Sequence, residues 1–213
     1  MKITVLGAAG NVGRRIVNEA LSRGHEVTAV VRSADRIHEL SPSTIGQTGD
    51  ASKIDDIVRL STGQDLVVNA TRSVTSSAEE VVIVTETIME GLARTGVRLL
   101  IVGGAASLTV PGANGKKVID DPQFLPPSIR HIGEASVAQY EACRGEMRVD
   151  WSYLSPPADL NPGKRTGQYR LGGDEMVVDS QGISTLSIED LAVVVLDEAE
   201  TPRHHQTRFT AAY

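Results

Sequence analysis

The sequence has few aromatic residues and a single cysteine, and both scarcities limit what the protein can be. Aromatic residues make up 3% of the 213 residues, so few side chains can stack on a flat ligand. The only cysteine, Cys143, excludes an internal disulfide and gives no basis for a metal cluster. The adjacent His204 and His205 lack the further ligands that a metal site needs. We therefore expect neither a disulfide framework nor a metal centre.

Long apolar runs and an excess of positive charge are also missing. No stretch approaches the roughly 20 apolar residues that span a bilayer, and a predicted strand begins at the N-terminus, where a signal peptide would stand. These features predict a cytoplasmic protein without a membrane partner. The net charge is -6, which disfavours a nucleic-acid partner because phosphate binding needs a clustered basic face. The oligomeric state is left open, a homodimer included.

Short β-branched runs alternate with segments of helical periodicity, a pattern typical of βαβ units and a parallel sheet. The predicted strands are 2–6, 26–31, 44–47, 65–69, 98–102, 150–154 and 207–211. The predicted helices are 11–22, 34–40, 53–60, 78–95, 128–146 and 188–200. Pro and Gly dominate the stretch after Leu154, which predicts loops with short strands at 168–171 and 176–178. We expect one doubly wound α/β domain over residues 1–213, in which 155–213 supply a substrate-side cap, the last helix and the last strand.

Three glycines follow the first predicted strand at intervals of three residues: Gly7, Gly10 and Gly13. A turn from strand into helix aims backbone N–H groups at one spot, and the helix dipole adds partial positive charge there. Gly7 would permit the sharp turn, Gly10 the approach of a pyrophosphate, and Gly13 close packing of helix on strand. This position predicts a dinucleotide site, and the alternative is a glycine turn that only solves a packing problem. The other residues of the turn that we predict to contact the dinucleotide are Ala9, Asn11 and Val12.

The end of the second predicted strand indicates which dinucleotide is preferred. An NAD site usually carries an acid about 20 residues after the glycines, whereas an arginine accommodates the 2′-phosphate of NADP. Here Val31 is followed by Arg32, with Arg36 one helical turn beyond. We expect NADP(H) in preference to NAD(H), with an ordinary exposed arginine as the alternative interpretation.

Residues after the third and fourth predicted strands are further candidates for the cofactor site. Asp50 either accepts a hydrogen bond from the adenine amino group or is only an N-cap for the next helix. Asn69 and Ala70 end the fourth strand, where small residues let the chain pass close to a bound cofactor.

Several longer motifs resemble a known family. "KITVLGAAGNVGRRIVNEALSRGHEVTAVVRS", "LLIVGGAASL", "VDWSYLSPP" and "GQYRLGGDE" resemble, in that order, the atypical short-chain dehydrogenases of the NAD(P)H-binding and NADH-flavin reductase type. These proteins are relatives of biliverdin reductase B and of NmrA-like regulators. The resemblance covers nearly the whole chain and implies a Rossmann-type sheet of order 3-2-1-4-5-6 or a close variant. It places the nicotinamide at the carboxyl ends of the first, fourth and fifth strands, and Gly103 and Pro156 beside the cofactor.

The tyrosine and lysine used by most short-chain dehydrogenases are missing. The corresponding positions fall near Ile132 and Ser136, which cannot do that chemistry, and Tyr140 with Arg144 is expected to be an ordinary pair of helix residues. What remains is hydride transfer that needs mainly stacking and orientation. We expect a reductase of a flavin, a quinone or a similar small conjugated acceptor, with FMN or riboflavin as candidate substrates.

Ser107 and His131 are the candidate catalytic residues. Ser107 lies just beyond the fifth strand and His131 near the missing tyrosine, while a turn-stabilising serine and a surface histidine are the alternatives. The loops 107–127 and 155–164 are the predicted substrate walls. Two other functions stay open: an NmrA-like sensor that binds dinucleotide without turning it over, and a tailoring ketoreductase that has replaced the usual tyrosine.

Overall fold

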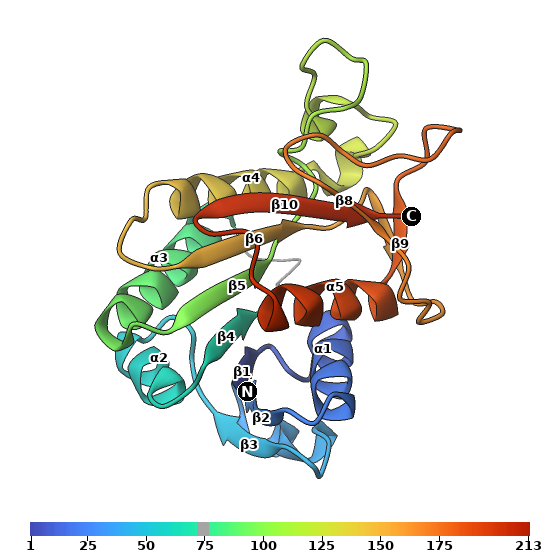
Figure 1. The fold of residues 1–213 in the computed structure, drawn as a ribbon. Coiled ribbons are helices and arrows are strands. Elements are labelled where there is room, and N and C mark those ends of the chain that lie inside the picture. The colour runs from blue at the N-terminus through green and yellow to red at the C-terminus, as the bar shows by residue number, and fades with distance from the viewer. Residues whose placement is uncertain (72–76) are drawn as a thin grey trace.

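An eight-stranded sheet forms the centre of the computed structural model, which describes residues 1–71 and 77–213 (Figure 1). The strand order is β3-β2-β1-β4-β5-β6-β10-β8, so the predicted order 3-2-1-4-5-6 is confirmed and β10 and β8 extend it. The paired strands run parallel except β8, which is antiparallel to β10. The strands are β1 (Lys2–Leu6), β2 (Glu26–Val31), β3 (Ile45–Thr48), β4 (Leu66–Asn69), β5 (Arg98–Val102), β6 (Trp151–Ser155), β8 (Arg170–Gly172) and β10 (Thr207–Ala212).

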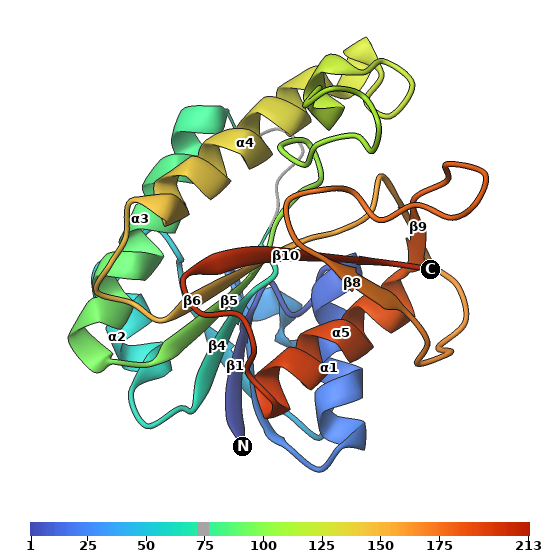
Figure 2. The same ribbon diagram turned by 45° about the horizontal axis from the view of Figure 1, so that its top comes forward.

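Helices cover both faces of this sheet (Figures 1 and 2). One face carries α1 (Asn11–Ser22) and α5 (Ile188–Glu200), which pack against each other. The other carries α2 (Ile54–Ser61), α3 (Ala78–Thr95) and α4 (Arg130–Arg144). The structure also contains three short 3-10 helices among the described residues: η1 (Ala34–Glu39), η2 (Val118–Asp120) and η3 (Pro127–Ile129). The layers are those of a Rossmann-like fold.

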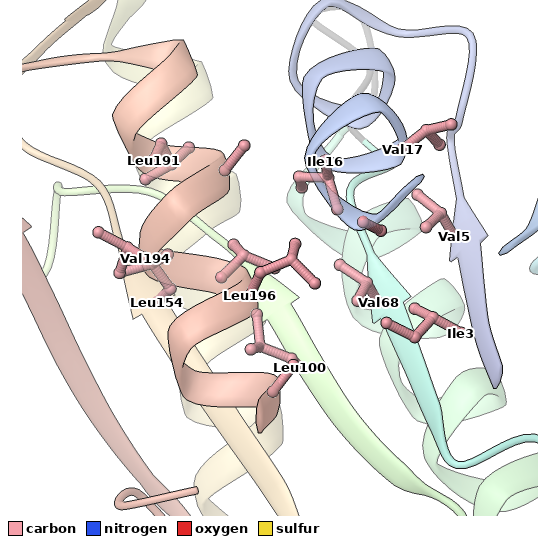
Figure 3. Close-up of a cluster of buried hydrophobic side chains, with 14 of the residues drawn as sticks. Ile3, Val5, Ile16, Val17, Val68, Leu100, Leu154, Leu191, Val194 and Leu196 are labelled. Atoms are coloured by element: carbon pink, nitrogen blue, oxygen red, sulfur yellow. The ribbon is translucent and has the colours of Figure 1, made fainter. Parts of the chain in front are cut away.

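The packing of the core explains why the strand sequences are continuous runs of apolar residues. Figure 3 shows Leu196 of α5 next to Leu100 of β5, and Leu191 of α5 and Ile16 of α1 belong to the same buried cluster. A second buried cluster fills the space under α2, α3 and α4. Because strand side chains alternate between two covered faces, both sets of positions must be apolar.

The region after β6 differs from the prediction. No strand forms at 176–178: Met176 is buried with Leu108 and Val118, and Glu175 makes only an isolated bridge to Thr109. A parallel pair, β7 (Asp159–Asn161) with β9 (Thr185–Ser187), was missed, and β7 lies inside the predicted loop 155–164. Strands of three residues are too short to show an alternating pattern.

Two predicted helices also differ in kind or bounds. The segment predicted at 34–40 is the 3-10 helix η1, and the segment predicted at 128–146 begins as η3 and becomes α-helical only at Arg130.

Candidate functional site

Close backbone contacts explain the glycines between β1 and α1. Gly7 has a φ of +81°, and a Cβ there would lie 2.8 Å from the carbonyl oxygen of Ala70. A Cβ at Gly13 would lie 2.2 Å from the carbonyl oxygen of Gly7. Gly10 is exposed and is the N-cap of α1, so no side chain of its own covers the N–H groups of the first helical turn. A tight turn thus presents an uncovered helix N-terminus, which is an arrangement that binds anions.

The other predicted residues of this turn have different surroundings. Ala9 lines the cleft described below. The side-chain oxygen of Asn11 accepts a hydrogen bond of 2.5 Å from Arg15. Val12 packs against the core cluster under α1 and α5. Asn11 and Val12 therefore have local structural contacts as well as their place at the N-terminus of α1.

A cleft of about 230 Å³ opens beside the turn, at the carboxyl ends of the strands. Of the predicted cofactor residues, it brings together Gly7, Ala9, Gly10, Arg32, Asp50 and Ala70, and it also contains Arg36. Further lining residues are not marked by any motif in the sequence: Ser52, Thr71, Glu80, Val81, Val84 and Gln139. The residues from α3 and α4 carry no motif, because a single polar or apolar residue on a helix looks the same whether it faces a cleft or a neighbouring helix.

The two arginines on the cleft wall differ in their partners. Arg36 donates from Nε and from one terminal nitrogen to the carboxylate of Glu39, at 2.7 and 2.8 Å, and this pairing raises the pKa of Arg36. Arg32 is exposed, and no hydrogen bond or ion pair joins its guanidinium to another residue within 1–71 and 77–213. Among the described residues, none therefore competes with an anion for the guanidinium of Arg32 at the end of β2.

Asp50 is held in a local turn. Its carboxylate accepts hydrogen bonds from the hydroxyl and the backbone N–H of Ser52, at 2.7 and 3.0 Å, and these bonds lower its pKa. The N-cap of α2 is Lys53, so the interpretation of Asp50 as an N-cap is wrong. The carboxylate of Asp50 lies ionised at the edge of the cleft, where it can accept further hydrogen bonds.

The remaining predicted cofactor residues also have structural contacts. Asn69 is buried, and its side-chain oxygen accepts hydrogen bonds from Thr71. A Cβ at Gly103 would lie 2.0 Å from the ring of Tyr153, which gives this glycine a packing reason. Pro156 is buried directly after β6. These three are absent from the residues that line the cleft.

The predicted catalytic residues lie in different surroundings. Ser107 is 5% exposed, and its hydroxyl oxygen accepts a hydrogen bond of 2.7 Å from Arg208. His131 is exposed in the first turn of α4. Arg208 was missed, because it lies 101 residues further along the chain on a strand with no motif.

The residues at the positions of the missing tyrosine and lysine are Ile132 and Ser136, and both lie on α4. Ile132 is half-buried, and the hydroxyl of Ser136 donates to the carbonyl of Gly133 in its own helix. Tyr140 is more than an ordinary helix residue, since the guanidinium of Arg208 stacks on its ring at 4.3 Å and burial raises its pKa. Arg144 is paired with Glu141 on the surface of the same helix.

Other residues considered from the sequence lie outside the cleft. Tyr153 is fully buried in β6 and belongs to the core. Cys143 is buried, and burial raises the pKa of its thiol to about 12, as in a packing residue that is not a nucleophile. His204 contacts Glu198 and stacks on Phe209, and His205 contacts Asp150.

The fold and the cleft define a Rossmann-like protein with an uncovered helix N-terminus after its first strand. The chain matches the model of the NAD(P)H-binding family over residues 7–202, and it belongs to that family. It is 36% identical over 215 residues to the uncharacterized protein YwnB of Bacillus subtilis, a match that covers 99% of this chain and 97% of YwnB.

Solved structures show the same architecture. A protein of Bacteroides thetaiotaomicron, provisionally named an epimerase, is 39% identical with a TM-score of 0.89, over 100% of this chain and 96% of that one. A protein of Streptococcus pneumoniae, provisionally named an NADH-flavin reductase, is 31% identical with a TM-score of 0.85, over 100% and 99%. A third, from Burkholderia pseudomallei, is provisionally named an exported protein, with 34% identity, a TM-score of 0.89 and full coverage of both chains. Among the described residues, no helix is long and apolar enough to cross a bilayer.

Proposed function

We propose that the protein is an NAD(P)H-dependent reductase that transfers hydride from the nicotinamide to a flavin, a quinone or a similar small conjugated acceptor. The observation that carries the proposal is the uncovered N-terminus of α1, which meets the cleft at Gly7 and Gly10. In this proposal the whole chain, 1–213, acts as one NAD(P)-binding domain in the cytoplasm. Residues 155–213 complete its substrate side.

The residues present fit a dinucleotide. The close backbone contacts at Gly7 and Gly13 keep the turn tight, and the exposed Gly10 has no side chain that could cover the N–H groups of α1. These N–H groups can therefore hold the diphosphate. Asp50 would accept a hydrogen bond from the adenine amino group at the other end of the cleft. When bound, the nicotinamide supplies the hydride, and the protein's part is to orient it and to place a hydroxyl near the acceptor.

NADP(H) is the preferred form in this proposal because Arg32 has no described partner, whereas Arg36 is already bound to Glu39. An arginine recognises a phosphate with paired, charge-assisted hydrogen bonds. We therefore assign the 2′-phosphate to Arg32 first and to Arg36 second.

Calorimetric titration of an Arg32→Gln variant tests this assignment. The affinity for NADPH should fall about tenfold or more, since one charge-assisted contact is worth about 1.5 kcal/mol or more, while the affinity for NADH stays within about twofold. Arg94→Gln is the matched control, because Arg94 is an exposed arginine paired with Glu90 on α3. Equal loss of both nucleotides, or of neither, would contradict the role of Arg32.

The absorbance of NADPH in the presence of FMN, riboflavin or a quinone tests the reaction itself. Oxidation above background with at least one acceptor supports the reductase. NADPH binding without oxidation across the panel would favour an NmrA-like sensor, a candidate supported by the replacement of the catalytic pair by Ile132 and Ser136. Loss of turnover in His131→Ala or Tyr140→Phe, with cofactor binding intact, would identify the acid of a ketoreductase.

A further inference from the structure

We infer that Arg208 is a positioning residue for Ser107: it fixes the serine hydroxyl as a hydrogen-bond acceptor, which leaves the hydroxyl proton free to be given to the substrate. The consequence for turnover rests on the proposed reductase function. The effect on Ser107 itself rests on the geometry alone, and the two can be tested separately.

The sheet register brings Arg208 level with the last residues of β1 and β4. The paired residues form one row across five strands: Leu6, Asn69, Ile101, Tyr153 and Arg208. Leu6 and Asn69 are the last residues of β1 and β4, whereas β5, β6 and β10 continue beyond the row. The side chain of Arg208 reaches the carboxyl side of the sheet through its contact with Ser107, which follows β5. Leu6, Ile101 and Tyr153 share the core cluster under α3 and α4, and Arg208 contacts Tyr140 of α4 on that same face.

Arg208 is near the expected position of the nicotinamide. Neighbouring strands lie about 4.8 Å apart, so β10 is roughly 10 Å from β5, two strands away. Ser107 follows β5 and bridges this interval through its hydrogen bond to Arg208. The pair therefore lies on the substrate side of the site, beyond the part of the cleft that would hold the diphosphate.

Three contacts fix the guanidinium of Arg208, whose side chain is 5% exposed. One terminal nitrogen donates to the Ser107 hydroxyl at 2.7 Å. Nε donates to the carboxylate of Asp174 at 2.9 Å, and the second terminal nitrogen also donates there. The plane stacks on the ring of Tyr140 at 4.3 Å. Asp174 is in turn attached to the segment after β5, because its carbonyl accepts from the backbone N–H of Thr109.

The hydrogen-bonding chemistry of arginine decides the direction of the contact with Ser107. A guanidinium has donors and no acceptor, whereas a hydroxyl has one proton and two acceptor lone pairs. Ser107 must therefore accept from Arg208, and its own proton points elsewhere. The adjacent positive charge also stabilises a negative charge on the serine oxygen. The counter-ion Asp174 is 76% exposed, so water screens its effect more than that of the buried cation.

The step assigned to this pair balances as a two-electron reduction. The acceptor gains a hydride from the nicotinamide, which is oxidised, and a proton from the Ser107 hydroxyl. The serine oxygen regains its proton from water. Arg208 itself exchanges no proton, because a guanidinium remains charged in proteins.

A cysteine in place of Ser107 reports the effect of Arg208 without any turnover. The ultraviolet absorbance of the thiolate, followed against pH, gives the thiol pKa in Ser107→Cys alone and in Ser107→Cys with Arg208→Gln. We expect the pKa to be at least about one unit lower when Arg208 is present, since a neighbouring opposite charge shifts a pKa by about 1–3 units. The native Cys143 does not interfere, because its pKa is raised to about 12. Equal thiol pKa values in the two backgrounds would overturn the inference.

A second substitution avoids loss of the buried arginine. Asp174→Asn removes an exposed counter-ion and keeps Arg208, so it should lower the thiol pKa of Ser107→Cys further. Arg98→Gln is the matched structural control: Arg98 is 11% exposed and pairs with Glu198, at the amino end of β5. It should destabilise the fold and leave the thiol pKa unchanged. A thiol pKa that does not change in Asp174→Asn, or changes as much in Arg98→Gln, would contradict the assignment.

A double-mutant cycle then tests the role in turnover. Ser107→Ala and Arg208→Gln should each lower kcat by about 10²-fold, the usual size of a lost proton-transfer group, with NADPH affinity retained. The double variant should be no slower than either single variant, because the two residues act as one unit. Losses that multiply would overturn the positioning role. If the wild type reduces no acceptor, the proposed function fails, and the thiol measurements still decide whether Arg208 acts on Ser107.

Discussion

Gly13 has the closest backbone approach in the turn that defines the site. A methyl group there would lie 2.2 Å from the carbonyl oxygen of Gly7. Gly7 and Gly13 flank the turn between β1 and α1, so this contact would force the turn to open. We expect Gly13→Ala to lower the free energy of unfolding by about 3 kcal/mol, at the upper end for overpacking, and to weaken NADPH binding. Denaturant titration with and without NADPH measures both effects.

Gly173 provides the control for this substitution. A Cβ at Gly173 meets no atom within 4 Å, and its φ lies outside the left-handed region. Gly173→Ala should therefore change the free energy of unfolding by no more than about 0.5 kcal/mol. Similar losses in the two variants would show that the close contact at Gly13 is not what requires a glycine.

Single residues could be predicted from the sequence where the local backbone conformation requires a particular residue type. Gly7, Gly10 and Gly13 form a spaced pattern at a strand–helix junction, and the reason for the pattern is local. Arg208 could not be found in this way, because its meeting with Ser107 is produced by the pairing of β10 with β6. Arg32 was found from its position after β2, while the pairing of Arg36 with Glu39 needed side-chain geometry.

At the scale of elements, the N-terminus of α5 depends on a buried carboxylate. Asp190 is fully buried and accepts hydrogen bonds from Thr166, Gly167 and Tyr213. Burial opposes ionisation, but these hydrogen bonds outweigh it and hold the pKa of Asp190 below its usual value. The ionised side chain thus attaches α5 to the segment after β7 and to the C-terminal residue.

The sign of this pKa shift gives a pH dependence. Because the folded pKa is below that of the unfolded chain, the stabilisation is fully present above about pH 4, near the unfolded pKa of Asp, and is lost as pH falls toward the folded value. Denaturant midpoints measured from pH 7 down to pH 3 should fall less steeply in Asp190→Asn than in the wild type. Asp55→Asn, an exposed position on α2, should keep the wild-type slope, and a wild-type slope in Asp190→Asn would contradict the assignment.

Long elements were predictable and short ones were not. The six strands from β1 to β6 and the helices α1, α3 and α5 follow their apolar periodicity closely. The strands β7 and β9 have three residues each. In the predicted strand at 176–178, Met176 is buried without sheet pairing, and the two valines are half-buried. Burial and pairing coincide in long strands, whereas in short segments either can occur alone.

At the scale of the molecule, the proposed dinucleotide contacts gather at the carboxyl ends of β1 to β4. Hydrogen exchange with and without NADPH should therefore show new protection in 7–13 and 49–52. The amino edge, at 24–26 and 96–98, should exchange at the same rate in both states. Protection spread evenly over both edges would indicate general stabilisation without a defined site.

Calorimetric titration of the wild-type protein with NADPH and with NADH tests the central claim most directly. The first turn of α1 and the cleft beside it are expected to bind one NADPH per chain, more tightly than NADH. Absence of binding heat with both nucleotides over a range of temperatures would contradict the account, since no dinucleotide would then occupy the turn at Gly7, Gly10 and Gly13.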